Sequence, residues 1–276
     1  TTQAGALTSD QVNAMTTAQI NSLTSDEVNA LSSTDINKLS LTNVAALTTT
    51  ALNSLTTNLS AALTSDQVNA LTSKEVQSLT SDQLTSLSTT VVNNMSADQI
   101  KLLNSAQVAG LQTSQIAALS TMTISSMTTT ALSNLSTTQV ATFTSDQVNA
   151  LTTAQVNSLT SDEVNALSTN DINKLSLTNV AALSTTALQA LTTNLSAVLT
   201  SDQVNGLTSK EVQSLTSDQL TSLTTTVVNN LTAAKLKLLN SVQVAGFQPA
   251  QITALSTSTI TSITTAALSS LSTGQV

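Results

Sequence analysis

The chain has 276 residues, of which 40% are hydrophobic and only 8% charged, and its formal net charge is −8. Cysteine, histidine, arginine, tryptophan and tyrosine are absent, so most side chains used in catalysis and metal binding are missing. An acidic chain without clusters of Lys and Arg argues against binding to nucleic acid or to an anionic membrane. No apolar run approaches the ~20 residues of a membrane span.

An eight-residue unit, typified by Leu-Thr-Ser-Asp-Gln-Val-Asn-Ala, repeats without interruption from Leu7 onward. We number its positions from one, the leucine, to eight. Matching stretches recur at one constant offset, as 64–87 does at 200–223, which indicates duplication of a unit of 17 octads. The sequence therefore predicts one continuous array over residues 1–276, with a first block at 7–142 and a nearly complete second block at 143–276. Since both ends fall inside an octad, we expect the array to belong to a longer one.

Four placements within the octad predict a short α-helix in each. Position two is Ser, Thr or Asn almost throughout, which are preferred helix N-caps, and Gln or Glu at position five completes a capping box. Asp and Glu occupy positions four and five, in the first turn, whereas Lys38 and Lys101 lie in the last turn. The only proline, Pro249, directly follows a cap position. A β-solenoid with stacked threonines is the alternative, because Thr and Val favour strands.

Positions one and six are apolar and form the predicted core, and position two holds the predicted caps. The core residues singled out are Leu7, Val12, Leu63, Val68, Leu199 and Val204, and the structural N-caps are Thr8, Thr64, Asn104, Thr200 and Asn240.

One long helix is excluded, because eight residues at ~100° each overshoot two turns and would wind the apolar stripe around the axis. Isolated helices this short are unstable, so the octads must stack on one another. The predicted fold is an all-α solenoid of very short capped helices, one per octad, with Leu and Val inside and hydroxyl side chains outside. Small residues at position eight, such as Gly110, are expected at tight corners. The odd count of 17 argues against a pair of octads or a coil of three as the unit, and the number of helices per turn stays open.

No catalytic, cofactor or metal site is predicted. Paired acidic residues such as Asp26 and Glu27 are explained by the helix first turn, and no histidine is present to activate a Ser or Thr nucleophile. Position six turns polar at Ser60 and Ser196, which occupy matching places in the two blocks. These two serines mark either a local change of helix phase or an irregular contact point, such as a bend or a lateral contact.

Octads of the type Leu-Thr-Thr-Ala-Gln-Val-Asn-Ser, at 151–158, resemble the long octapeptide arrays of very large bacterial surface or secreted proteins described as adhesin-like. The resemblance implies an extracellular or cell-surface location and a structural or adhesive role without enzyme activity. We expect a stalk, fibre or filament built by extension of the solenoid and by lateral self-association, so that the main partner is another copy of the chain.

The alternative is an adhesin-type binding module for a glycan, a protein receptor or ice. Only two aromatic residues, Phe143 and Phe247, are present, and both occupy the core position, so the sequence offers no evident recognition surface.

Overall fold

In the computed structural model, which describes residues 3–275, regular structure is entirely helical and no strand occurs in that range. A single 3-10 turn, Ala4–Ala6, precedes the first α-helix. Every α-helix begins at position three of an octad, and each octad from Leu7 to Ser270 holds one helix. The predicted all-α tandem-repeat solenoid is thereby confirmed, and the β-solenoid alternative is wrong.

The chain divides into two compact units, and the boundary in the sequence falls between Thr142 and Phe143. The helices of the first unit are α1 (Ser9–Asn13), α2 (Thr17–Ser22), α3 (Ser25–Asn29), α4 (Ser33–Lys38), α5 (Leu41–Val44), α6 (Thr49–Asn53), α7 (Thr57–Ser60), α8 (Ser65–Asn69), α9 (Ser73–Ser78), α10 (Ser81–Ser86), α11 (Thr89–Asn93), α12 (Ala97–Leu102), α13 (Ser105–Ala109), α14 (Thr113–Ala118), α15 (Thr121–Ser126), α16 (Thr129–Leu132) and α17 (Thr137–Val140). The helices of the second unit are α18 (Ser145–Ala150), α19 (Thr153–Ser158), α20 (Ser161–Ala166), α21 (Thr169–Lys174), α22 (Leu177–Val180), α23 (Thr185–Ala190), α24 (Thr193–Ser196), α25 (Ser201–Gly206), α26 (Ser209–Ser214), α27 (Ser217–Ser222), α28 (Thr225–Asn229), α29 (Ala233–Leu236), α30 (Ser241–Ala245), α31 (Pro249–Ala254), α32 (Thr257–Ile260) and α33 (Thr265–Leu268).

Two consecutive extended residues form the corner between successive helices. At the end of α4, Leu39 has φ −56° and ψ 135°, and Ser40, which caps α5, has φ −61° and ψ 154°. Positions one and two take these extended angles wherever a helix runs through position eight. No residue between 3 and 275 has a positive φ, so the chain turns each corner without the left-handed residue that ends many helices.

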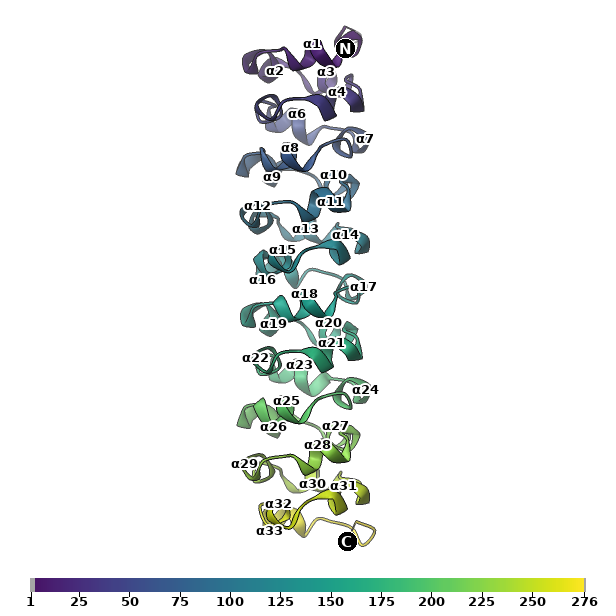
Figure 1. Ribbon diagram of the computed structural model, residues 1–276, viewed down its shortest axis with the longest axis vertical. Helices are drawn as coiled ribbons and strands as arrows, with labels where there is room; N and C mark the ends of the chain where they lie inside the picture. The colour runs from purple at the N-terminus through teal and green to yellow at the C-terminus, as the bar shows by residue number, and fades with distance from the viewer. Residues whose placement is uncertain (1–2, 276) are drawn as a thin grey trace. The chain divides into compact units, whose positions relative to one another are not determined.

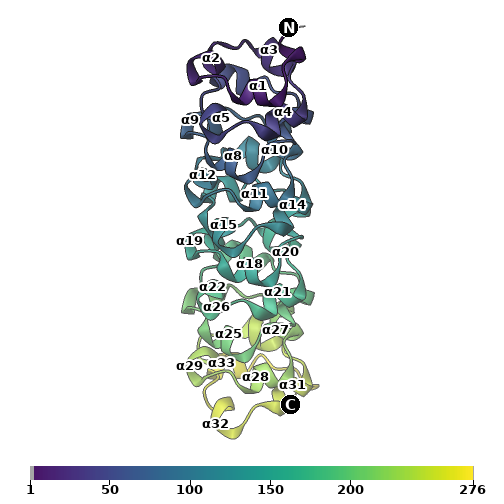
Figure 2. The same cartoon turned by 45° about the horizontal axis from the view of Figure 1, so that its top comes forward.

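Within each unit the chain winds into a superhelix with three helices per turn. Each helix packs on the third one along the chain, as α8 does on α11, α11 on α14, and α25 on α28. The labels in Figure 1 follow this winding, and Figure 2 shows α8 beside α11 and α25 beside α28. The prediction from the odd number of octads in the block, that a coil of three is not the unit, is therefore wrong. Each helix needs only a partner three octads away, so the number of octads in a block need not be a multiple of three.

The core of each unit consists of the side chains at positions one and six. Val12 and Val68 are fully buried, Leu63 and Leu199 are 3% exposed and Val204 is 2% exposed. Leu7 differs from this prediction and is only half-buried. It precedes the first α-helix, where no earlier turn of the superhelix covers it.

Glycine at position eight serves packing between turns. A Cβ on Gly110 would lie 2.7 Å from the Cβ of Ser81, and one on Gly246 would lie 2.7 Å from the Cβ of Ser217. Both glycines have φ −76°, a value open to any residue. The predicted close approach is real at these two positions, but it lies between successive turns and not at the corner.

We predict that Leu84→Ala destabilises the protein by about 2–5 kcal/mol, because Leu84 is fully buried and its truncation leaves a cavity. Urea unfolding followed by circular dichroism measures the change. Leu41→Ala is the matched control: this side chain is 48% exposed, so we expect a change within about 0.5 kcal/mol. Equal losses in the two variants would contradict the assignment of the core.

Candidate functional site

The N-cap side chains at position two accept hydrogen bonds from the backbone N–H of position five. The acceptor atoms are Oγ1 of Thr8 at 3.3 Å, Oγ1 of Thr64 and Thr200 at 3.2 Å each, and Oδ1 of Asn104 and Asn240 at 3.0 Å each. In return, the position-five side chain accepts from the N-cap N–H, as Gln67 does from Thr64 at 2.9 Å. These reciprocal bonds satisfy N–H groups that a helix start leaves unpaired.

The same glutamines also hold the preceding turn of the superhelix. Nε2 of Gln67 donates to the carbonyls of Ile36, Asn37 and Leu39 at 2.8, 3.2 and 2.8 Å. These carbonyls lie at the C-terminal end of α4, where that of Ile36 also accepts from the N–H of Leu39 at 3.2 Å and the usual i+4 donors are missing. Gln67 is 1% exposed, so one buried amide satisfies the start of its own helix and the end of another. The sequence predicted only the first of these two roles.

Other donors replace glutamine at position five without losing the contact to the preceding turn. Asn43 donates to the carbonyls of Asn13 and Met15 at 3.2 and 3.3 Å, and the ammonium of Lys235 donates to the carbonyl of Leu207. The preference of position five for side chains with N–H groups was the signal in the sequence for this contact. The contact was not predicted because the capping box alone already explained glutamine at this position.

Where position seven is asparagine, its side chain links one turn to the next. Nδ2 of Asn69 donates to the carbonyl of Asn94 at 2.8 Å, and its Oδ1 accepts from the N–H of Ser96 at 3.0 Å. In α7, where Leu59 at position five offers no acceptor, this second bond replaces the capping box, because the N–H of Thr56 donates to Asn29 instead. The helix starts are thus satisfied from two directions.

Aspartate at position five needs a donor from the preceding turn. Oδ1 of Asp35 accepts from the hydroxyl of Ser9 at 2.6 Å, and Oδ2 accepts from the hydroxyl and N–H of Ser32 at 2.6 and 2.9 Å. Burial raises the pKa of Asp35, but the hydrogen bonds from Ser32 and Ser9, with a smaller contribution from Lys38, outweigh it and hold the pKa below 3.8. The second unit repeats the arrangement in Asp171, which accepts from Ser145 at 2.8 Å.

Glutamate at position five keeps the cap but cannot donate to the turn before it. Oε2 of Glu75, Glu163 and Glu211 accepts from the N-cap N–H at 2.6 Å in each case. Oε1 of Glu163 is buried without a hydrogen-bond partner among the described residues. Glu75 and Glu211 have the same single bond to the N-cap N–H, and as carboxylates none of the three can donate to the preceding turn.

Ser60 and Ser196 lie inside the superhelix and are each 1% exposed. Their hydroxyls donate to the carbonyls of Thr56 and Thr192 at 3.1 and 3.0 Å, one turn back in the same helix. Leu59 and Leu195, the preceding residues, are also buried. The predicted lateral contact therefore has no exposed side chain at these serines.

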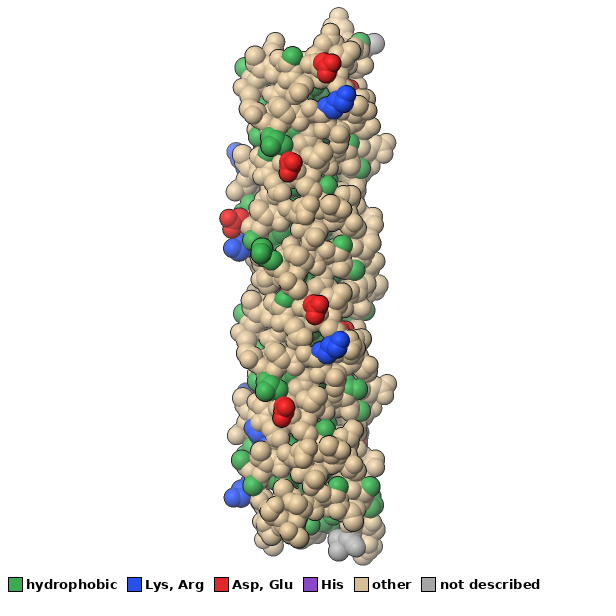
Figure 3. Space-filling model, in the orientation of Figure 1, with side chains coloured by type: hydrophobic (Ala, Val, Ile, Leu, Met, Phe, Trp, Pro, Cys, Tyr) green, Lys and Arg blue, Asp and Glu red, His purple; other side chains and the backbone are tan. Residues whose placement is uncertain are grey.

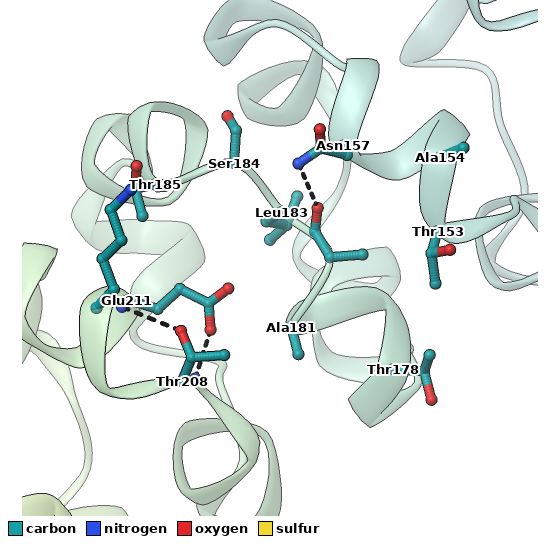
Figure 4. Close-up of a pocket in the computed structure, with 12 residues that line it drawn as sticks. Thr153, Ala154, Asn157, Thr178, Ala181, Leu183, Ser184, Thr185, Thr208 and Glu211 are labelled. Carbon is teal, nitrogen blue, oxygen red and sulfur yellow. Dashed lines mark hydrogen bonds between the residues drawn. The ribbon is translucent and has the colours of Figure 1, made fainter.

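The second unit contains a groove. It has a volume of about 760 Å³, and Glu211, Lys210, Leu183 and Asn157 contribute to its lining. In Figure 4, Glu211, Leu183 and Asn157 lie around an open space, and Glu211 is bonded to Thr208 at one side. Asn157 donates to the carbonyl of Ala182. The groove has no aromatic wall.

Elsewhere most exposed side chains are uncharged and polar, such as Thr, Ser and Asn, and Figure 3 shows few charged side chains on one face. Among residues 3–275 no cluster of three or more His, Cys, Asp and Glu side chains could hold a metal ion. No helix in the same range has the length and apolar character needed to cross a bilayer.

Residues 12–41 and 145–177 match the model of the ALTTAQ repeat family. Both stretches contain the threonine-rich octads described above, and they lie in different units. The chain is thus similar to this repeat family in part of each unit. None of the curated proteins matches it.

We predict that Gln83→Leu lowers the free energy of unfolding by about 2–4 kcal/mol, because the carbonyls of Leu52, Asn53 and Leu55 lose their buried donor. Thermal and urea unfolding measure this loss. In the control variant Gln11→Leu only the cap of an exposed glutamine is removed, and we expect a loss of about 1 kcal/mol or less. Similar losses in both would show that the contact between turns contributes little.

Asp35 also predicts an acid-sensitive contribution to stability. Its pKa is lowered in the folded protein, so this contribution is present above the unfolded value near 3.8 and is lost as the pH falls through the folded pKa. We expect Ser9→Ala to raise the pKa of Asp35, measured by carboxyl ¹³C chemical shifts. Ser145→Ala, which removes the equivalent hydroxyl beside Asp171, should leave the Asp35 titration unchanged. An unaltered titration in Ser9→Ala would contradict the assigned hydrogen bond.

Proposed function

We propose that this chain is a non-catalytic structural segment of a secreted or surface-anchored bacterial protein, in which it acts as a stalk or fibre. One observation carries the proposal: the amide bonds between turns recur at a fixed spacing. Gln67, Gln83, Gln203 and Gln219 donate to Leu39, Leu55, Leu175 and Leu191, each 28 residues earlier. Each turn therefore offers the next turn the same kind of carbonyl acceptors that its own amides bind in the turn before. The number of octads then sets the length of a unit.

The polar surface supports an extracellular setting. Most exposed side chains carry hydroxyl or amide groups, charged residues make up 8% of the chain, and cysteine is absent, so the fold depends on no disulfide. The resemblance to octapeptide arrays of large bacterial surface proteins points in the same direction. A stalk requires a regular, extensible structure more than a recognition site, and the repeated bonds supply it.

Lateral self-association would turn such stalks into fibres. Leu41 and Leu177 occupy position three of matching octads in the two blocks, and they are 48% and 49% exposed. Exposed leucines of this extent are exceptions on an otherwise polar surface. A contact that uses one such leucine on each copy and a different patch on its neighbour does not close and therefore propagates.

Electron microscopy of the purified chain, with circular dichroism on the same sample, tests this proposal. We expect a helical spectrum and regular elongated particles that associate side by side or end to end at high concentration. Irregular, collapsed particles with a helical spectrum would contradict a role as a stalk.

We predict that the double variant Leu41→Glu/Leu177→Glu weakens self-association at least about 10-fold, because it places charge at both exposed leucines. Sedimentation velocity over a concentration series measures the effect. Met122→Glu is the control, since Met122 is 72% exposed but has serine at the equivalent position of the second block. Unchanged association in the double variant would exclude these leucines from the contact.

The second candidate is a binding module for a glycan or a protein receptor, and the groove beside Glu211 favours it. Phe143 and Phe247 are 5% and 2% exposed, so neither offers an aromatic surface to a ligand. Screening the whole chain against a panel of immobilised glycans tests this candidate, and an absence of binding at millimolar concentration would remove the glycan alternative.

A further inference from the structure

The groove of the second unit contains an unsatisfied acidic side chain. Glu211 is 5% exposed and its carboxylate points into the open space in Figure 4. Its Oε2 accepts from the N–H of Thr208 at 2.6 Å. No described residue donates to Oε1, and this oxygen is not itself buried but open to the groove.

The carbonyl of a corner residue in the same groove also lacks the donor that equivalent carbonyls have. In neighbouring octads, Nε2 of Gln203 and Gln219 donates at 2.9 Å to the carbonyls of Leu175 and Leu191. The equivalent carbonyl beside Glu211 belongs to Leu183, which lines the groove and receives no hydrogen bond from any described residue. Both unsatisfied groups are acceptors, and the end of α22 adds partial negative charge.

Lys235 indicates which kind of group fits. It occupies position five of its own octad, and its ammonium donates to the carbonyl of Leu207, 28 residues earlier. This is the same carbonyl position that Leu183 holds relative to Glu211. The end of a helix in this fold therefore accepts an ammonium group, and beside Glu211 that place has no occupant from the described chain.

We propose that this groove binds a small molecule through a primary ammonium group, which donates to Oε1 of Glu211 and to the carbonyl of Leu183. Lys210 also lines the groove and its charge opposes a bare cation. The ligand class that satisfies both charges is a small amino acid, whose ammonium meets Glu211 and whose carboxylate meets Lys210.

The first unit carries the same residues. Of the twelve side chains that line the groove, eleven recur at the matching positions of the first block, and only Ser184 is replaced, by Thr48. Glu75 there is 5% exposed and its Oε2 accepts from Thr72 at 2.6 Å. The carbonyl of Leu47, the counterpart of Leu183, has no donor among the described residues. The proposal therefore extends to an equivalent site in the first unit, beside Glu75.

Calorimetric titration of the whole chain with three probes tests the proposal. We expect glycine to bind with a stoichiometry of two, about 3-fold more tightly than methylamine, because it adds an exposed ion pair to Lys210. Tetramethylammonium has the same charge as methylammonium but no N–H group, and it should bind at least about 10-fold more weakly than methylamine. Equal binding of tetramethylammonium and methylamine, or no binding of any probe, would overturn the proposal; the latter result would mean that water alone fills the grooves.

Variants identify the sites. Glu211→Gln supplies the amide donor found at Gln203 and Gln219, and we expect it to reduce the glycine stoichiometry from two to one. Glu75→Gln in the same chain should reduce it to zero, while the circular dichroism spectrum stays helical and the unfolding temperature does not fall. Glu27→Gln is the control: Glu27 caps Thr24 in the first turn of the array, lines no such groove, and should leave the stoichiometry at two. Full binding by the double variant would place the ligand elsewhere and contradict the assignment.

Discussion

An α-helix of four to six residues consists mostly of its own ends, because the first four N–H groups and the last four carbonyls have no intrahelical partner. The side-chain amide at position five forms hydrogen bonds with unpaired backbone groups at both kinds of helix end. In Gln67 and Gln83 one oxygen accepts from the start of a helix, and one nitrogen donates to the end of another helix in the preceding turn. Stacking therefore does more than bury Leu and Val: without it, neither the helices nor the corners between them would have their backbone groups satisfied.

Local chemistry made much of this structure predictable. Capping residues at positions two and five, acidic residues in the first turn and the proline at 249 each depend on a single helix, so the sequence predicted one helix per octad. The number of helices per turn depends instead on the angle that two extended residues impose at each corner, and composition does not encode that angle. The burial of glutamine was missed for a related reason, because its capping role alone explained its position. The groove at Glu211 follows from the missing amide nitrogen, which becomes visible only once the preceding turn is in place.

Position five shows how the array tolerates variation. Gln, Asn and Lys donate to the preceding turn, Asp35 accepts a hydroxyl from it, and Glu75 and Glu211 leave it unsatisfied. A single unsatisfied acceptor costs about 1–3 kcal/mol. In an array this cost is small beside the summed stability of the many similar junctions. Places where the repeat loses a bond are thus places where a ligand can gain one, and the two glutamates have kept their surroundings in both blocks.

The bonds between turns also constrain how such an array can evolve. Because most junctions use the same groups, gain or loss of a single octad brings new neighbours together without changing the chemistry of their contact. The pairs Ser9 with Asp35 and Ser145 with Asp171 behave differently, since each joins a specific hydroxyl to a specific carboxylate 26 residues away. An octad inserted between the partners would separate the carboxylate from the serine hydroxyl that donates to it. Such pairs require a fixed spacing between two octads in a repeat that otherwise tolerates changes of length. They therefore favour duplication of long blocks, in which both partners of each pair are copied together.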